Sequence, residues 1–218
     1  MILNIVYSLV ILLSGLIAIH FRKALKSHGL FIFIPYLLFV FVQEMSILLY
    51  TMSNPHQSNA VIYNVIYRPL TVSFYGLIYY HVPFNSFKKP ILFLAIAYLL
   101  SVFISFGFFH SIFKFNHFLY LGSGLIISIF AILFLLSYFK IDNFDIEKKW
   151  HPLLWITIGI AIYYPVVSIS FSLYNYLYQF NTTLLGVKLY QLVPKIMSLF
   201  MYGCFSYSFY LCRKETLI

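Results

Sequence analysis

Three ionisable side chains lie inside otherwise apolar runs of the 218-residue chain: Glu44, Arg68 and Lys195. Ionisable residues in membrane helices are costly, about 2.5–3.5 kcal/mol each on insertion scales, and they mark ligand sites, ion pathways or interhelical pairs. With a helical rise of about 1.5 Å per residue, all three lie roughly 8–12 Å below the outer surface of the predicted bundle. A shared depth is required for a paired cluster and equally for a pocket that opens to that side.

Further polar residues follow these three at helical spacing. Steps of three and four residues place side chains on one helical face, and Asn64, Arg68 and Tyr75 are spaced in this way, as are Gln191 and Lys195. Polar residues in the sixth apolar run and next to Glu44 extend the pattern. We therefore predict a ligand-binding set made of Glu44, Arg68, Lys195, Asn64, Gln191, Gln43, Tyr75, Tyr164 and Asn175.

The charges of this set favour a small anionic or amphipathic ligand, because one carboxylate faces two cations. Arg68 is the expected anchor, since a guanidinium binds a carboxylate or phosphate through two parallel hydrogen bonds. Two alternatives stay open. Glu44 could pair with Arg68 or Lys195 and lock helices together, or the same charges could serve a small transporter or channel for a solute or protons.

No motif of catalysis or metal binding is present. The sequence has no Ser/His/Asp set, no Gly-rich phosphate loop and no metal-ligand spacing, so we predict no catalytic residue, no metal site and no cofactor. An intramembrane enzyme acting on lipid stays a third class, with no nucleophile–base set to support it. A retinal protein is disfavoured because Lys195 lies near the outer end of its run and the third run has no acidic counter-ion.

The elements that must position these residues follow from composition. Hydrophobic residues make up 62% of the chain and charged residues 9%, against about 25% charged residues in soluble domains. This excludes a soluble enzyme, a disordered chain and a nucleic-acid-binding domain, despite the net charge of +9. A bilayer core of about 30 Å needs about 20 apolar helical residues. We predict one all-α domain over 1–218, a bundle of seven spans at roughly 2–19, 30–50, 61–80, 91–109, 118–139, 153–178 and 189–211.

The orientation follows from the basic residues between the spans. Ten Lys and Arg residues fall in the first, third and fifth loops and the C-terminal tail, whereas two, Lys114 and Lys188, fall in the other loops. Because positive loops stay in the cytoplasm, we predict an outer N-terminus and a cytoplasmic C-terminus. The residue usage is typical of an AT-rich bacterial genome. Together with the seven spans, it predicts a multi-pass protein of the plasma (inner) membrane.

Local features add three expectations about packing. Pro69 and Pro194 adjoin Arg68 and Lys195 and predict local distortion of their helices. The run at 91–109 is almost wholly apolar and is expected to face lipid. The segment 122–124, with glycines at both ends, predicts a close helix contact.

Several short features resemble a loose family of short, uncharacterised bacterial seven-helix membrane proteins. They are Gln43 with Glu44, Phe74 with Tyr75, and residues 152–159 followed by Tyr163 and Tyr164. Members are often encoded beside signalling genes such as histidine kinases, so the resemblance implies a sensory role with a cytoplasmic signalling partner. The sequence thus favours a receptor-like sensor in the lipid bilayer that binds a small molecule and no nucleic acid.

Overall fold

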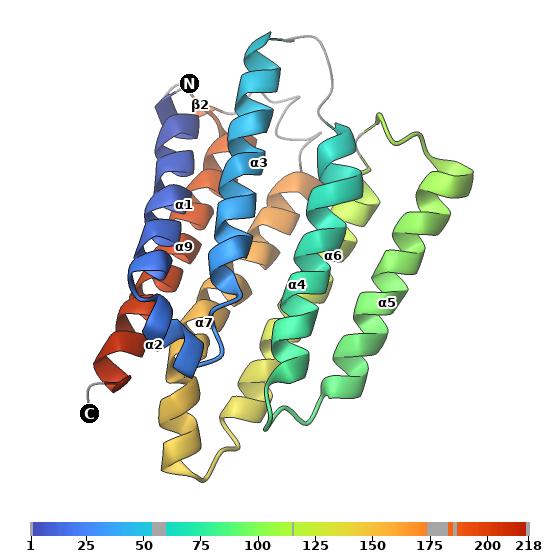
Figure 1. The fold of residues 1–218 in the computed structure, drawn as a ribbon. Helices are drawn as coiled ribbons and strands as arrows, with labels where there is room; N and C mark the ends of the chain where they lie inside the picture. The colour runs from blue at the N-terminus through green and yellow to red at the C-terminus, as the bar shows by residue number, and fades with distance from the viewer. Residues whose placement is uncertain (1, 54–59, 115, 174–182, 185–186, 217–218) are drawn as a thin grey trace. The chain divides into compact units, whose positions relative to one another are not determined.

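The computed structural model is all-α apart from one short hairpin, and it describes residues 2–53, 60–114, 116–173, 183–184 and 187–216. Long apolar runs form its helices, because a helix satisfies nearly every backbone polar group within the segment. Their bounds are α1 Ile2–His20, α2 Arg22–Ser27, α3 Phe33–Ser53, α4 Arg68–His81, α5 Lys88–Ile104, α6 His117–Tyr138, α7 Phe144–Ser172 and α9 Leu189–Thr216 (Figure 1).

The chain divides into two compact units, whereas the sequence predicts a single domain. Unit 1 comprises Met1–Asn54, Ile141–Tyr163 and Lys195–Ile218, and unit 2 comprises Pro55–Lys140 and Tyr164–Pro194. Helices α7 and α9 each contribute residues to both units. Each unit is described by itself below.

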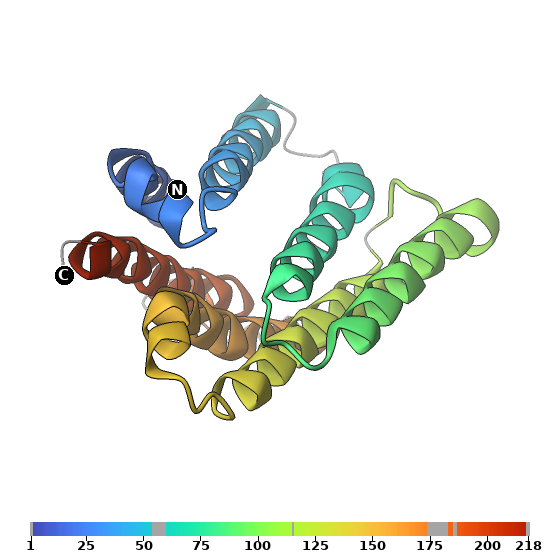
Figure 2. The ribbon, with the colours of Figure 1, turned by 60° about the horizontal axis from the view of Figure 1, so that its bottom comes forward.

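Unit 1 is a helical bundle in which α9 contacts every other long helix. Helix α1 packs against α3 (Figure 2). The ring of Phe33 on α3 lies 5.6 Å from that of Phe205 on α9. A Cβ atom added to Gly159 of α7 would lie 3.0 Å from Cβ of Cys204. The hydroxyl of Ser208 donates to the carbonyl of Pro152 at 2.6 Å, so α7 and α9 are joined by both packing and a hydrogen bond.

Unit 2 is built on α4, α5 and α6, which pack against one another. Glycine at position 76 allows the close approach of α4, because a Cβ atom there would lie 3.4 Å from both Ala95 of α5 and Phe130 of α6. Gly124 of α6 approaches residues 164–168 of α7, and an added Cβ would collide with Oγ of Ser168. Gly122 has no atom within 4 Å of such a Cβ. The predicted close contact at 122–124 is therefore made by Gly124 and not by Gly122.

Four helices of the described chain are long and apolar enough to cross a membrane: Phe33–Ser53, Lys88–Phe109, His117–Tyr138 and Phe144–Ser172. They support a multi-pass helical membrane protein in contact with the lipid bilayer. The helix at 88–109 buries only 17% of its apolar window, the smallest share of the four, which agrees with the expected lipid-facing position.

The helix bounds differ from the predicted spans mainly at charged ends. The segment 140–151 is a loop in the prediction, but α7 already begins at Phe144, with Asp145 and Glu147 in its first turn. Carboxylates stabilise a helix N-terminus through the helix dipole, so charge there does not end the helix. Residues 174–178, the last part of the predicted sixth span, lie outside the described residues.

Three local features were absent from the prediction. Two π-helical segments, η1 at Ile62–Tyr67 and η2 at Ser105–Phe109, adjoin α4 and α5. In η1 the N–H of Arg68 bonds to the carbonyl of Tyr63, five residues earlier, directly before Pro69, which has no N–H to donate. The strands β1 Thr183–Leu184 and β2 Val187–Lys188 pair as an antiparallel hairpin, with Thr183 opposite Lys188.

Candidate functional site

The guanidinium of Arg68 is the central feature of unit 2. Its side chain is buried, with 6% of its surface exposed. Cζ lies 3.4 Å from the ring centroid of Tyr120 and 5.5 Å from that of Tyr67, which is cation–π geometry. Nη1 donates to Oγ of Ser123 at 3.5 Å, and the charge also acts on Tyr98. Arg68 thus lies in an aromatic and hydroxyl-lined environment supplied by Tyr67, which directly precedes it, and by α5 and α6.

The π-turn before Arg68 positions Asn64, another residue of the predicted ligand set. The amide of Asn64 donates to the carbonyls of Ile112 and Lys114, at 3.2 and 2.8 Å. Its oxygen accepts from the N–H of Asn116 at 3.5 Å. These bonds hold the 112–116 segment against η1, so Asn64 acts as a structural tie within unit 2.

Two further predicted residues, Tyr75 and Tyr164, meet inside unit 2. Both are buried, and their ring centroids lie 5.9 Å apart at an interplanar angle of 80°. This edge-to-face geometry is a favourable aromatic pair. Tyr120 packs against Phe171 of α7 in a tilted pair, with 4.4 Å between ring centroids and an interplanar angle of 53°, so the aromatic lining around Arg68 is itself fixed by packing.

Glu44 and Lys195 are brought together in unit 1. They lie on α3 and α9, are partly exposed, and interact electrostatically. Lys195 directly follows Pro194, which lies inside α9. The carboxylate of Glu44 is therefore within electrostatic range of Lys195, and a direct ion pair between them stays a prediction. The meeting of all three charges stays a prediction, because Arg68 belongs to unit 2.

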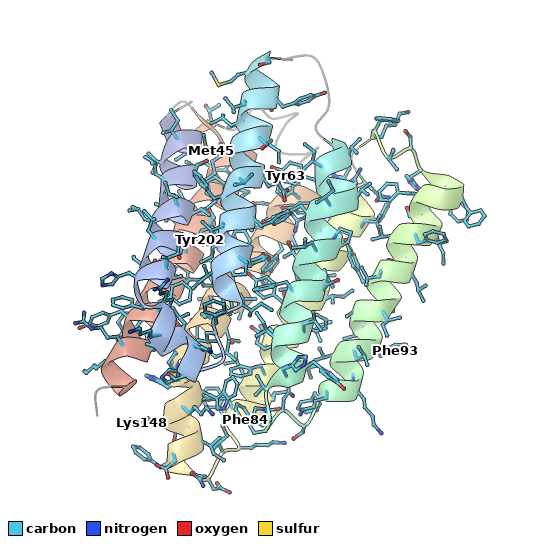
Figure 3. The ribbon with its side chains drawn as sticks, viewed as in Figure 1. Met45, Tyr63, Phe84, Phe93, Lys148 and Tyr202 are labelled. Carbon is cyan, nitrogen blue, oxygen red and sulfur yellow. The ribbon has the colours of Figure 1, made fainter. Side chains whose placement is uncertain are left out.

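A group of tyrosines surrounds this pair and was absent from the predicted set. Tyr202 of α9, labelled in Figure 3, is buried. Its side chain is hydrogen-bonded to that of Tyr7 and interacts electrostatically with Glu44, Tyr36 and Tyr163. The rings of Tyr7 and Tyr202 lie 6.4 Å apart. Tyr202 lies seven residues after Lys195 and therefore on the same face of α9. Tyr7, Tyr36 and Tyr163 lie on other helices, so sequence spacing could not relate them to Tyr202.

Gln43, next to Glu44, is the most unusual polar side chain of unit 1. It is 6% exposed, and within the described part of the chain neither its amide nitrogen nor its amide oxygen has a hydrogen-bond partner. An unsatisfied buried amide costs about 1–3 kcal/mol. Such a group is retained where a bound molecule or water supplies the missing bonds.

The remaining predicted residues contribute less. Gln191 lies in the first turn of α9, and Asn175 lies outside the described residues. Among the residues that the structure describes, no group of three or more His, Cys, Asp or Glu side chains could hold a metal ion. The described site residues thus form two chemical environments, an aromatic-stacked guanidinium in unit 2 and a carboxylate–ammonium–tyrosine cluster in unit 1.

Comparison with known proteins returned no matching family model, no matching curated protein and no matching solved structure.

Proposed function

We propose that this chain is a receptor-like sensor of a bacterial plasma membrane, and that it binds a small anionic or amphipathic ligand through Arg68. In this proposal seven helices cross the bilayer, with the N-terminus outside and the C-terminus in the cytoplasm. The distribution of Lys and Arg between the apolar segments supports this orientation. The four long apolar helices support the membrane location.

The observation that carries the proposal is the burial of Arg68 in a unit whose sequence contains no Asp or Glu. Residues 55–140 and 164–194 hold none of the five acidic residues of the chain. Any carboxylate that meets this guanidinium therefore comes from elsewhere in the chain or from a ligand.

The cost of burying the Arg68 cation can be compared with the interactions that stabilise it, and the comparison favours an anionic ligand. Burying an ion costs several kcal/mol even after relaxation. A desolvated cation–π contact such as that with Tyr120 returns about 2 kcal/mol, and a hydrogen bond to a hydroxyl about 1.5–3 kcal/mol when one partner is charged. Among small ligands, a carboxylate or phosphate bound in bidentate fashion makes the strongest interaction with a guanidinium.

The output of the sensor is proposed to be a cytoplasmic partner. The predicted cytoplasmic segments are short and basic, and they carry no catalytic motif, so enzymatic output must come from another protein. The resemblance to small seven-helix proteins associated with signalling genes agrees with this role.

The test is a thermal-shift titration of the purified chain in neutral detergent. Inorganic phosphate, acetate, succinate and octanoate are compared at constant ionic strength. A ligand present at 100 times its Kd stabilises a protein by about 2.7 kcal/mol, which raises Tm by several degrees. We expect one of these anions to raise the Tm of the wild type.

Three variants decide whether Arg68 is the anchor. Arg68→Gln is expected to abolish the shift. Arg68→Lys, which keeps the charge but lacks the planar fork, is expected to weaken binding at least tenfold. Lys114→Gln removes an exposed cation of the same unit and should leave the shift unchanged. An anion effect that persists in Arg68→Gln, or no anion effect at all, would contradict the proposal.

A transporter is the second candidate, supported by the prolines of α7 and α9. Each helix passes from one unit to the other beside a proline. In α7 the boundary lies between Tyr163 and Tyr164, next to Pro165. In α9 it lies between Pro194 and Lys195. Proline removes a helical hydrogen bond, and such positions serve as hinges in transporters whose bundles rock against each other.

Liposome uptake separates the two candidates. A transporter loads a labelled anion into proteoliposomes, and Pro165→Ala with Pro194→Ala should slow uptake while anion binding in detergent stays unchanged. A sensor binds the same anion without uptake. Uptake by the wild type would replace the sensor proposal with the transporter.

A further inference from the structure

Six exposed cations gather at one end of unit 1, on three segments that are far apart in the sequence. This basic end carries Arg22, Lys23 and Lys26 on α2, Lys149 on α7, and Arg213 and Lys214 on α9. The three segments lie at the same end of the unit in both views (Figures 1 and 2). Within unit 1, Lys195 lies near the start of α9 and Arg213 near its end, so the basic end is separate from Lys195.

Contacts within unit 1 hold the segments of the basic end together. Cζ of Arg213 lies 5.7 Å from the ring of Phe21, and that ring lies 6.5 Å from Tyr210. This fixes the end of α9 beside the start of α2. On the other side of α2, Nδ1 of His28 is hydrogen-bonded to the carbonyl of Lys149 at 2.7 Å, which fixes the first turns of α7.

The end of α2 is held by a specific turn. Gly29 has a φ of +71°. Its N–H donates to the backbone carbonyl of Lys26, and the N–H of Leu30 donates to the backbone carbonyl of Leu25. This is the Schellman motif, which caps a helix and defines where the chain leaves it. The positions of the α2 cations are therefore set by the fold.

Exposed apolar side chains lie directly beside these cations. Ile19 precedes Arg22 by one turn of helix, and Tyr210 precedes Arg213 by one turn. The exposed fractions of the apolar neighbours lie between 37% and 51%, and the group consists of Ile19, Phe31, Ile32, Tyr207 and Tyr210. Cations next to exposed aromatic and aliphatic groups match the boundary between lipid phosphates and acyl chains.

We propose that the basic end binds the headgroup phosphate of an anionic phospholipid. The exposed cations would meet the phosphate, and the neighbouring apolar residues would meet the acyl chains. The adjacency of the two kinds of residue favours a lipid over an acidic protein, whose binding would use the cations but leave the apolar group uncovered. The acids nearest to these segments in the sequence are Asp142, Asp145 and Glu147 around the start of α7 and Glu215 beside Lys214. Helix α2 contains three cations and no acid, so it carries the clearest surplus of positive charge.

The test uses the full chain in mixed micelles, with phosphatidylglycerol or phosphatidylcholine added at equal mole fraction. We expect phosphatidylglycerol to raise Tm by several degrees more than phosphatidylcholine, with a shift that falls as NaCl rises from about 0.05 to 0.5 M. Inorganic phosphate alone forms a third arm, and we expect it to have no effect at matched ionic strength.

Matched charge removal locates the site. The triple variant Arg22→Gln, Lys23→Gln, Lys26→Gln keeps good helix formers on α2 and should weaken the response to phosphatidylglycerol at least tenfold. The control variant Lys88→Gln, Lys89→Gln, Lys114→Gln removes three cations from unit 2. It should respond to phosphatidylglycerol as strongly as the wild type does. Equal Tm values in phosphatidylcholine show that both variants fold.

Several outcomes would overturn this inference. They are equal shifts with both lipids, an equal loss in the two triple variants, or an equal shift with inorganic phosphate alone. The inference is independent of the proposed sensor function, since Arg68→Gln should retain the lipid response even though it loses the response to small anions.

Discussion

Single atoms decide how closely the helices of unit 2 approach. A Cβ atom on Gly124 would collide with Oγ of Ser168 and lie 3.5 Å from the carbonyl of Tyr164, whereas the same atom on Gly122 meets nothing within 4 Å. Small residues allow membrane helices to approach closely where lipid offers no hydrophobic driving force. The two glycines are two residues apart and face roughly opposite sides of α6, so they have different roles.

Gly124→Ala is expected to lower stability by about 1–3 kcal/mol, the usual cost of overpacking. Ser168→Ala removes the colliding hydroxyl and should restore most of the loss, which a double-mutant cycle of unfolding free energies measures. Gly122→Ala is the matched control and should be neutral. Equal effects of the two glycine variants would contradict the contact with Ser168.

The stack of Arg68 on Tyr120 is a second feature at the scale of the residue. Tyr120→Leu removes the aromatic face and should cost about 2 kcal/mol, the value of a desolvated cation–π contact, together with the packing on Phe171. Tyr120→Phe keeps the ring and should cost less than half as much. Thermal unfolding in detergent measures both, and similar losses in the two variants would show that the ring face is not what stabilises Arg68.

At the scale of the element, glycine and proline determine where helices end or change pitch. Pro69 adjoins the π-turn η1, and that turn sets the direction of both Arg68 and Asn64. π-turns within helices are frequent at functional sites. The capping turn at Gly29 has a comparable role at the end of α2, since it directs the chain from α2 into α3.

Gly29→Ala should destabilise unit 1 by about 1–2 kcal/mol, because a Cβ atom is unfavourable in left-handed backbone. Gly29→Asn should cost less, since asparagine tolerates this conformation. Trp150 fluorescence during thermal unfolding reports the change, because Trp150 lies within 4 Å of a Cβ atom at position 29. A Gly29→Asn variant as unstable as Gly29→Ala would indicate steric exclusion by Trp150 as the cause.

At the scale of the whole molecule, the distribution of charge and the division into units carry the functional argument. All five acidic residues belong to unit 1, whereas Arg68 belongs to unit 2. The two proposed functions differ in whether α7 and α9 act as fixed supports or as hinges.

The proposed topology predicts the location of the loops and termini. Alkaline phosphatase fused after Phe113 should be active because that segment is expected outside, and fused after Lys140 it should be inactive. Green fluorescent protein at the C-terminus should fluoresce, since it folds in the cytoplasm. Activity of the fusion after Lys140 would contradict the seven-span orientation.

The sequence by itself determined the helical class, the approximate helices and the presence of charges inside apolar runs, because helix formation and hydropathy depend on residues close in the chain. Tertiary structure decided which side chains meet. It brought Glu44 within electrostatic range of Lys195 and placed Tyr7 beside Tyr202. It also used Asn64 as a tie to the backbone of Ile112, Lys114 and Asn116. Spacing along one helix defines a face, but it does not define the neighbouring helix that this face contacts.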